Sequence, residues 1–178
     1  MKRTAPRSKI RLSTMLAAVA VALTSGCDAV GALGNDGVSD PLTPEQAKSQ
    51  VIDAARSAVT ALDLQPIKAV LWLASCNDQG DAPFRGRMRI SYPLAATPDA
   101  SGTQIAEMVR RLQDAGWSTP TDFATHGSAL RKDGVVLAFE PQSVADTTRG
   151  IQVYGECRDV TTTKGNEGPD EDVALTPR

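Results

Sequence analysis

Histidine, cysteine and aromatic residues are scarce in this chain of 178 residues, which has one histidine, three cysteines and seven Phe, Trp and Tyr residues in all. A lone His126 without a C-x-x-C motif argues against a zinc site. No nucleophile stands in a recognisable elbow, and no glycine-rich phosphate loop precedes a helix. The sequence therefore predicts no catalytic residue, no cofactor and no metal ion, and we expect His126 to be a solvated loop residue.

Acidic residues are absent from the first 26 positions, which instead carry Lys2, Arg3, Arg7, Lys9 and Arg11. An apolar run follows from about residue 12 to 23, too short to cross a bilayer core of about 30 Å. This pattern indicates a signal peptide over residues 1–26. Its end, Leu-Thr-Ser-Gly-Cys at 23–27, resembles the bacterial lipobox, in which the cysteine is acylated and the chain is cut directly before it. One position departs from the lipobox, because Thr24 stands where leucine is usual.

The resemblance implies that Cys27 carries acyl chains such as palmitate, which hold the protein on the extracytoplasmic face of the cell membrane. Two alternatives remain open: secretion after cleavage at Ala20-Val21-Ala22, which leaves a free Cys27 thiol, and a signal retained as a membrane anchor. Residues 27–42 are rich in Gly and Asp and are expected to form a flexible tether with an r.m.s. span of about 20 Å.

Positive charge is in deficit once the signal is removed. The whole chain has 19 Lys and Arg against 21 Asp and Glu; five of the basic residues lie in the signal, so 14 remain and the net charge becomes −7. This balance argues against a nucleic-acid partner and against electrostatic docking on anionic lipid.

The remaining chain predicts one domain over residues 43–158, followed by a disordered tail over 159–178. A capping box at Thr43 and Gln46 starts a helix over 44–63, and a second helix starts between residues 99 and 103 and ends before Gly116. A strand that is buried on both faces is expected over 67–76. A second strand, with alternate residues facing inward, is expected over 87–92. A hairpin with its turn at Asp133-Gly134 and a last strand over 151–157 follow. The order α-β-β-α-β-β-β predicts an α+β fold, with two amphipathic helices on one face of a mostly antiparallel sheet of four to five strands.

If Cys27 is acylated, Cys76 and Cys157 are left as a pair in an oxidising compartment, which favours a disulfide bond over two buried free thiols. We interpret the residues after Cys76 as the residue types that form a turn beside that disulfide bond. The functional alternative is a rigid, exposed binding rim that meets an anionic group. Trp72 and Trp117 are expected in the core. The candidate rim residues are Asn77, Asp78, Phe84, Arg85 and Arg87, with Arg89 on the same outer face.

The middle of the chain also resembles uncharacterised actinobacterial lipoproteins. The resemblance covers roughly residues 44–158 and rests on Ser-Cys-Asn-Asp-Gln-Gly at 75–80 with Phe-Arg-Gly at 84–86, Ala-Gly-Trp at 115–117 and Gly-Glu-Cys at 155–157. It implies the same anchor and cysteine pair, and it implies no activity.

The sequence as a whole favours a non-enzymatic binding domain of the bacterial envelope that is held to the membrane by lipid. Its expected partner is an envelope protein or a small ligand. The alternative function is that of a cell-wall or envelope hydrolase.

Overall fold

A computed structural model describes residues 37–120 and 122–175. Predicted signal residues 1–26 and the lipidation candidate Cys27 therefore lie outside the described residues. The six strands form a sheet in the order β3-β4-β5-β2-β1-β6, and every neighbouring pair is antiparallel. The elements in chain order are α1 (Pro44–Leu62), β1 (Lys68–Ser75), β2 (Phe84–Tyr92), α2 (Pro98–Asp114), β3 (Ala129–Lys132), β4 (Val135–Phe139), β5 (Arg149–Tyr154) and β6 (Glu171–Asp172). The α+β class is confirmed, with one strand more than the five predicted.

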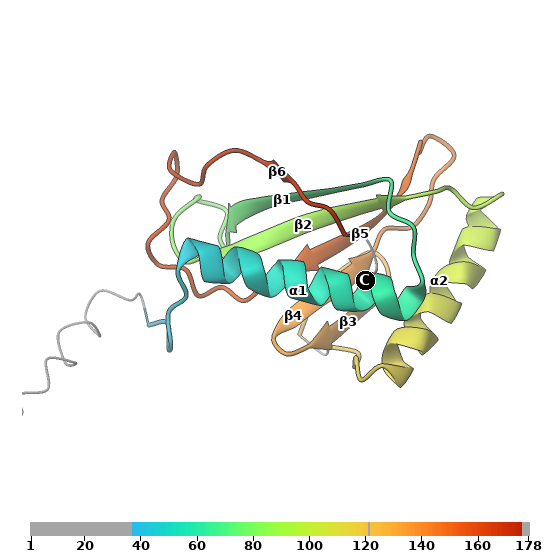
Figure 1. Ribbon diagram of the computed structural model, residues 1–178, viewed down its shortest axis with the longest axis horizontal. Helices are drawn as coiled ribbons and strands as arrows, with labels where there is room; N and C mark the ends of the chain where they lie inside the picture. The colour runs from blue at the N-terminus through green and yellow to red at the C-terminus, as the bar shows by residue number, and fades with distance from the viewer. Residues whose placement is uncertain (1–36, 121, 176–178) are drawn as a thin grey trace, which may run out of the picture. The chain divides into compact units, whose positions relative to one another are not determined.

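Helix α1 lies across β1, β2, β4 and β5, while α2 packs against α1 and the neighbouring strand β3 (Figure 1). Thr43 and Gln46 form the predicted capping box at the start of α1. Helix α2 begins at Pro98, slightly before the predicted range, because the Thr97 side chain caps it. At its end the Trp117 N–H donates to the Leu112 carbonyl at 3.0 Å, which is the predicted Schellman ending.

The core lies between the helices and one face of the sheet, which we call the helix face. Leu71, Met88 and Val153 follow one another across β1, β2 and β5 in register, and each is fully buried there. Gly86 lets α1 approach β2 closely, since a Cβ atom at this position would lie 2.4 Å from the Ala47 carbonyl oxygen. Trp117 is buried in this core as predicted.

Strand β1 differs from its prediction as a strand buried on both faces. Its residues alternate, so that Ala69, Leu71 and Leu73 are buried and Val70 and Trp72 are half-buried. The apolar run of β1 did not reveal this difference, because both sets of side chains are apolar. The second face of the sheet, which we call the open face, carries arginines on the adjacent strand β2.

The segment after residue 158 was wrongly predicted to be a disordered tail. The Asp159 carboxylate accepts hydrogen bonds from the backbone and hydroxyl groups of both Thr161 and Thr162. Strand β6 then pairs with β1, and Leu175 is buried in the main core. The composition is polar, but ordering here depends on backbone pairing and one apolar anchor rather than on an apolar face.

The predicted tether also ends earlier than residue 42. The Leu42 N–H donates to the Arg158 carbonyl at 2.8 Å, and the Arg158 Nε–H donates to the Asp40 carbonyl at 2.7 Å. The domain therefore begins by Asp40. Within residues 37–120 and 122–175, no helix is both long and apolar enough to cross a membrane.

Candidate binding site on the open face of the sheet

Arginines 85, 87 and 89 occupy alternate positions of β2 and project from the open face. Strand alternation places them there, because the intervening residues Gly86 and Met88 face the helices. In the described part of the chain, α1 and α2 both pack on the helix face, and the side chains of the open face cover one another instead. We call the following set the arginine face: Arg85, Arg87 and Arg89 on β2, Trp72 on β1, Tyr154 on β5, Arg131 on β3, and Phe123 from the loop before β3.

The Arg87 guanidinium lies between two aromatic rings. Its Cζ atom is 5.2 Å from the centre of the Trp72 ring and 4.6 Å from that of Tyr154, and its Nη2 donates to the Tyr154 hydroxyl at 3.3 Å. Register explains the arrangement, because Trp72 and Tyr154 are the direct cross-strand neighbours of Arg87 on β1 and β5. Rings stacked on the faces of a guanidinium leave its edge available for in-plane hydrogen bonds.

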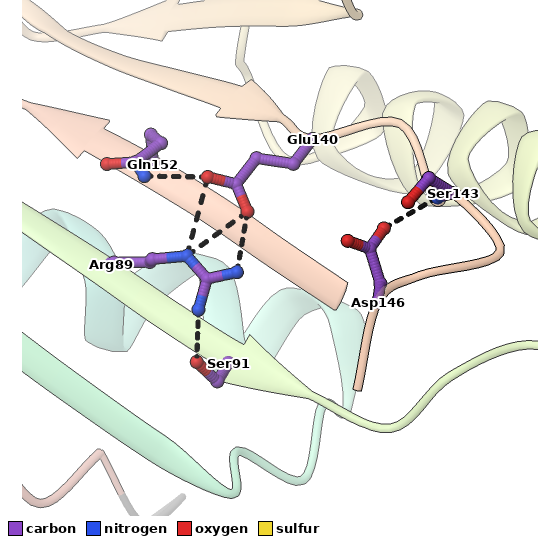
Figure 2. A network of polar contacts seen from close by, with 6 residues as sticks. All are labelled: Arg89, Ser91, Glu140, Ser143, Asp146 and Gln152. Carbon is purple, nitrogen blue, oxygen red and sulfur yellow. Dashed lines mark hydrogen bonds and ion pairs between the residues drawn. The ribbon is translucent and has the colours of Figure 1, made fainter. Parts of the chain in front are cut away.

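Arg89 is paired within the protein. Its Nη2 lies 2.8 Å from Glu140 Oε2, its Nε also donates to that carboxylate, and Nη1 donates to the Ser91 hydroxyl at 2.8 Å. Gln152 donates to the other carboxylate oxygen at 2.7 Å. Figure 2 shows the Arg89 and Glu140 side chains meeting above β2 and β5, with Gln152 reaching the same carboxylate. This pair shows how the edge of an open-face arginine receives a carboxylate.

Arg85 has no such partner. In the described part of the chain its guanidinium makes no ion pair, and its buried Nε has no hydrogen-bond partner. Its Cζ lies 5.1 Å from the centre of the Tyr154 ring. Burial, with the adjacent Arg87 charge, lowers the pKa of the Arg85 guanidinium, which still stays protonated at neutral pH.

A cavity of about 390 Å³ opens beside Arg85, at the end of the sheet that carries the disulfide bond. Arg131 and Arg158 also line it, and each has its own carboxylate: Arg131 lies 2.8 Å from Asp122, and Arg158 lies 3.1 Å from Glu156. The rings of Phe123 and Tyr154, 5.1 Å apart, form its apolar wall. The cavity thus combines three guanidinium groups and the Glu156 carboxylate with an aromatic surface.

Two of the predicted rim residues, Asn77 and Asp78, belong to the loop before β2 and lie outside the cavity. The Asn77 side-chain oxygen accepts from the N–H groups of Gln79, Gly80 and Asp81, each at 3.0 to 3.1 Å, which is turn chemistry. Asp78 is exposed. Neither residue lines the cavity, and neither Asp78 nor Asp81 forms an ion pair with Arg85 in the described part of the chain.

Phe84 is not exposed as predicted. It is the first residue of β2 and faces the helices, where it is 3% exposed and packs with Ala47 and Leu73. The strand starts three residues earlier than expected, so its alternation already places Phe84 inside and Arg85 outside. Arg85 therefore belongs to the sheet and not to an exposed loop.

Sequence reasoning missed the aromatic partners of the arginines. Trp72 was expected in the core, and Tyr154 and Phe123 were given no role. Cross-strand register was the missing information, because Trp72 and Tyr154 reach Arg87 only once β1 and β5 are known to flank β2.

Cys76 and Cys157 form the predicted disulfide bond, which joins the loop after β1 to the segment after β5. Cys157 lines the Arg85 cavity, so the bond fixes one of its walls. His126 is exposed in the loop before β3. Within the described ranges, no group of three His, Cys, Asp or Glu side chains is arranged to hold a metal ion.

Comparison with known proteins links this chain to mycobacterial lipoproteins. The family described as "Putative lipoprotein LppJ" matches residues 43–176. The protein of that name from Mycobacterium tuberculosis (strain ATCC 25618 / H37Rv) is 34% identical over 166 residues, which cover 87% of this chain and 86% of the relative. The Mycobacterium bovis protein is 33% identical over the same shares of both chains. No solved structure matches the chain.

Proposed function

Because the chain belongs to the LppJ lipoprotein family, we propose that an acylated Cys27 anchors it to the extracytoplasmic face of the cell membrane. The lipobox-like sequence before Cys27 supports this proposal, as does the use of the other two cysteines in a disulfide bond, which suits an oxidising compartment. Several acyl chains are sufficient for stable anchoring, since each buried methylene contributes about 0.8 kcal/mol.

The domain acts by binding an anionic group on its arginine face, and not by catalysis. The observation that carries this conclusion is the contrast among its arginines. Arg89 and Arg131 each have a carboxylate within 2.8 Å, whereas the adjacent Arg85 and Arg87 have none in the described part of the chain. Two half-buried cations side by side are unfavourable without an anion, and a bound anion would offset both their desolvation and their repulsion.

The chemistry of the face suits recognition. It offers guanidinium edges and aromatic rings, and the nearby carboxylates of Glu140 and Glu156 are each paired with an arginine. Arg and Trp or Tyr side chains together are also the residue types that contribute most to protein–ligand and protein–protein contacts.

Fractionation of cells that express Cys27→Ala tests the anchor. The variant should leave the membrane fraction for the soluble extracytoplasmic fraction, while the wild type stays with the membrane until detergent is added. A variant that still partitions into detergent, with a mature mass equal to that of the wild type, would contradict the lipid anchor.

Calorimetric titration with inorganic phosphate and with citrate tests the binding surface. We expect both anions to bind the wild type and Arg56→Ala, an exposed control position on α1. The double variant Arg85→Ala/Arg87→Ala should bind at least about tenfold more weakly, because two charge-assisted contacts are lost. Equal binding by the double variant and the control would exclude the arginine face as the anion site.

A further inference from the structure

We propose that the Arg85 cavity binds the phosphate of an anionic phospholipid head group in the membrane that carries the anchor. This inference rests on the proposed function and adds to it the identity of the anion. It follows from three features of the domain: the donors in the cavity, the place where the chain enters the domain, and the net charge of the protein.

The cavity presents donors that suit a phosphate. Arg85, Arg131 and Arg158 line it, and the Arg85 Nε, buried beside it, has no hydrogen-bond partner in the described part of the chain. Guanidinium groups bind phosphate oxygens in a bidentate manner. Because Arg131 and Arg158 already hold carboxylates, and one of these, Glu156, itself lines the cavity, Arg85 supplies the charge that an incoming phosphate neutralises. The volume of about 390 Å³ admits a glycerol-phosphate head but leaves no room for two acyl chains.

The chain enters the domain at the rim of this same cavity. Arg158 lines the cavity, and its guanidinium donates to the Asp40 carbonyl while its own carbonyl accepts from the Leu42 N–H. Only residues 28–39 lie between Asp40 and Cys27 in the sequence. The chain from Cys27 to Asp40 spans at most about 45 Å when fully extended, so an acylated Cys27 would hold the cavity within about that distance of the lipid surface.

Tethering makes a weak site sufficient. Attachment to a lipid through so few residues raises the effective concentration of the site at the membrane to the millimolar range. A head-group site with a millimolar dissociation constant is therefore partly occupied on the anchored protein, although the same site would hardly recruit a free domain.

Net charge restricts the kind of lipid. With a net charge of −7 after removal of the signal, the protein gains nothing from general attraction to an anionic surface, so binding depends on the local guanidinium cluster. Choline or ethanolamine beside the phosphate would bring a cation toward Arg85, which has no carboxylate partner in the described residues. A head group such as phosphatidylglycerol, which has no cation, is the favoured class.

Arginine footprinting with phenylglyoxal on the lipidated chain tests the inference. The protein is reconstituted into vesicles of phosphatidylcholine alone, and into vesicles of phosphatidylcholine with phosphatidylglycerol, and modification of each arginine is followed by mass spectrometry. Arg56 on α1 is the internal control, since its side chain is exposed and lies on the helix side of the sheet. We expect Arg85 to react about fivefold more slowly with phosphatidylglycerol present, as for a site four-fifths occupied, and Arg56 to react at the same rate in both.

Three other outcomes are decisive. Equal slowing of Arg56 would mean that the whole domain is pressed on the bilayer, and would overturn a head-group site. Protection of Arg85 by free inorganic phosphate but not by phosphatidylglycerol would overturn the lipid source and leave the anion site of the proposed function intact. Protection by neither would overturn both proposals.

Discussion

The side chains on the two faces of the sheet are shielded from water in different ways. On the helix face, Leu71, Met88 and Val153 are shielded by α1 and contribute to folding by leaving water. On the open face, Trp72, Arg87 and Tyr154 shield one another, and the cations among them are only partly compensated. One residue of offset along a strand therefore separates a side chain that stabilises the fold from one that is available for a ligand.

Alanine substitutions at two adjacent positions on β1 should show the largest difference in stability between the two faces of the sheet. Leu71→Ala removes a fully buried side chain from the core and should lower the free energy of unfolding by about 2–5 kcal/mol. Val70→Ala, on the open face, should cost less than about 1 kcal/mol, because Val70 is half-buried. Urea denaturation of both variants measures the pair, and equal losses would mean that the open face is a second core.

A substitution at Asp159 measures how much a buried, fully hydrogen-bonded carboxylate contributes to the free energy of unfolding. Asp159→Asn should lower the free energy of unfolding at pH 7 by about 1–3 kcal/mol, because the bonds from Thr161 and Thr162 lose a charged acceptor. Burial alone would raise the pKa of Asp159, but these hydrogen bonds outweigh it and lower the pKa. A depressed pKa stabilises the fold above the ordinary value of about 3.9 and loses that effect as pH falls through the folded value.

The difference in stability between the wild type and Asp159→Asn should therefore shrink below about pH 4. Chemical denaturation at a series of pH values gives the curve. A difference that stays constant down to pH 2 would show that the carboxylate charge has no part in the turn.

Glu140→Gln should change binding more than folding. The Arg89–Glu140 pair is about one-third exposed on both sides, so its loss should cost less than about 1 kcal/mol of stability. The variant leaves Arg89 as a third cation without a carboxylate, two residues from Arg87. At about 7 Å in water one extra charge contributes about 0.6 kcal/mol, so phosphate affinity should rise about threefold. Unchanged or weaker phosphate binding in calorimetry would show that the charge of Arg89 does not contribute to the anion site.

Local patterns in the sequence were sufficient for most of the architecture. The capping box at Thr43, the helix end at Gly116 and the Asp133-Gly134 turn each depend on residues within a few positions, and the structure has all three. Alternation in β2 also placed Met88 and Ile90 inward and Arg87 outward. These features were predictable because the physical cause and the residues that express it lie close together in the chain.

Features that depend on distant pairing could not be read in this way. Strand β6 is a strand only because it meets β1 about 100 residues away, and its polar composition suggested disorder. The aromatic rings about Arg87 depend likewise on β1 and β5 flanking β2. Arg87 and Arg89 were thus predictable from alternation, while the place of Arg85 in β2, its cavity and the aromatic partners Trp72 and Tyr154 required the structure.

The most direct test of the central claim measures whether Arg85 serves a ligand or the fold. Urea denaturation of the wild type and Arg85→Ala, with and without inorganic phosphate, gives four free energies of unfolding. Without phosphate the two proteins should agree within about 0.5 kcal/mol, since Arg85 has no ion pair to lose. With phosphate at ten times its dissociation constant, the wild type should gain about 1.4 kcal/mol and the variant almost nothing. A loss above about 2 kcal/mol in the variant without phosphate, together with equal gains in both proteins, would show that Arg85 is part of the architecture and that the anion binds elsewhere.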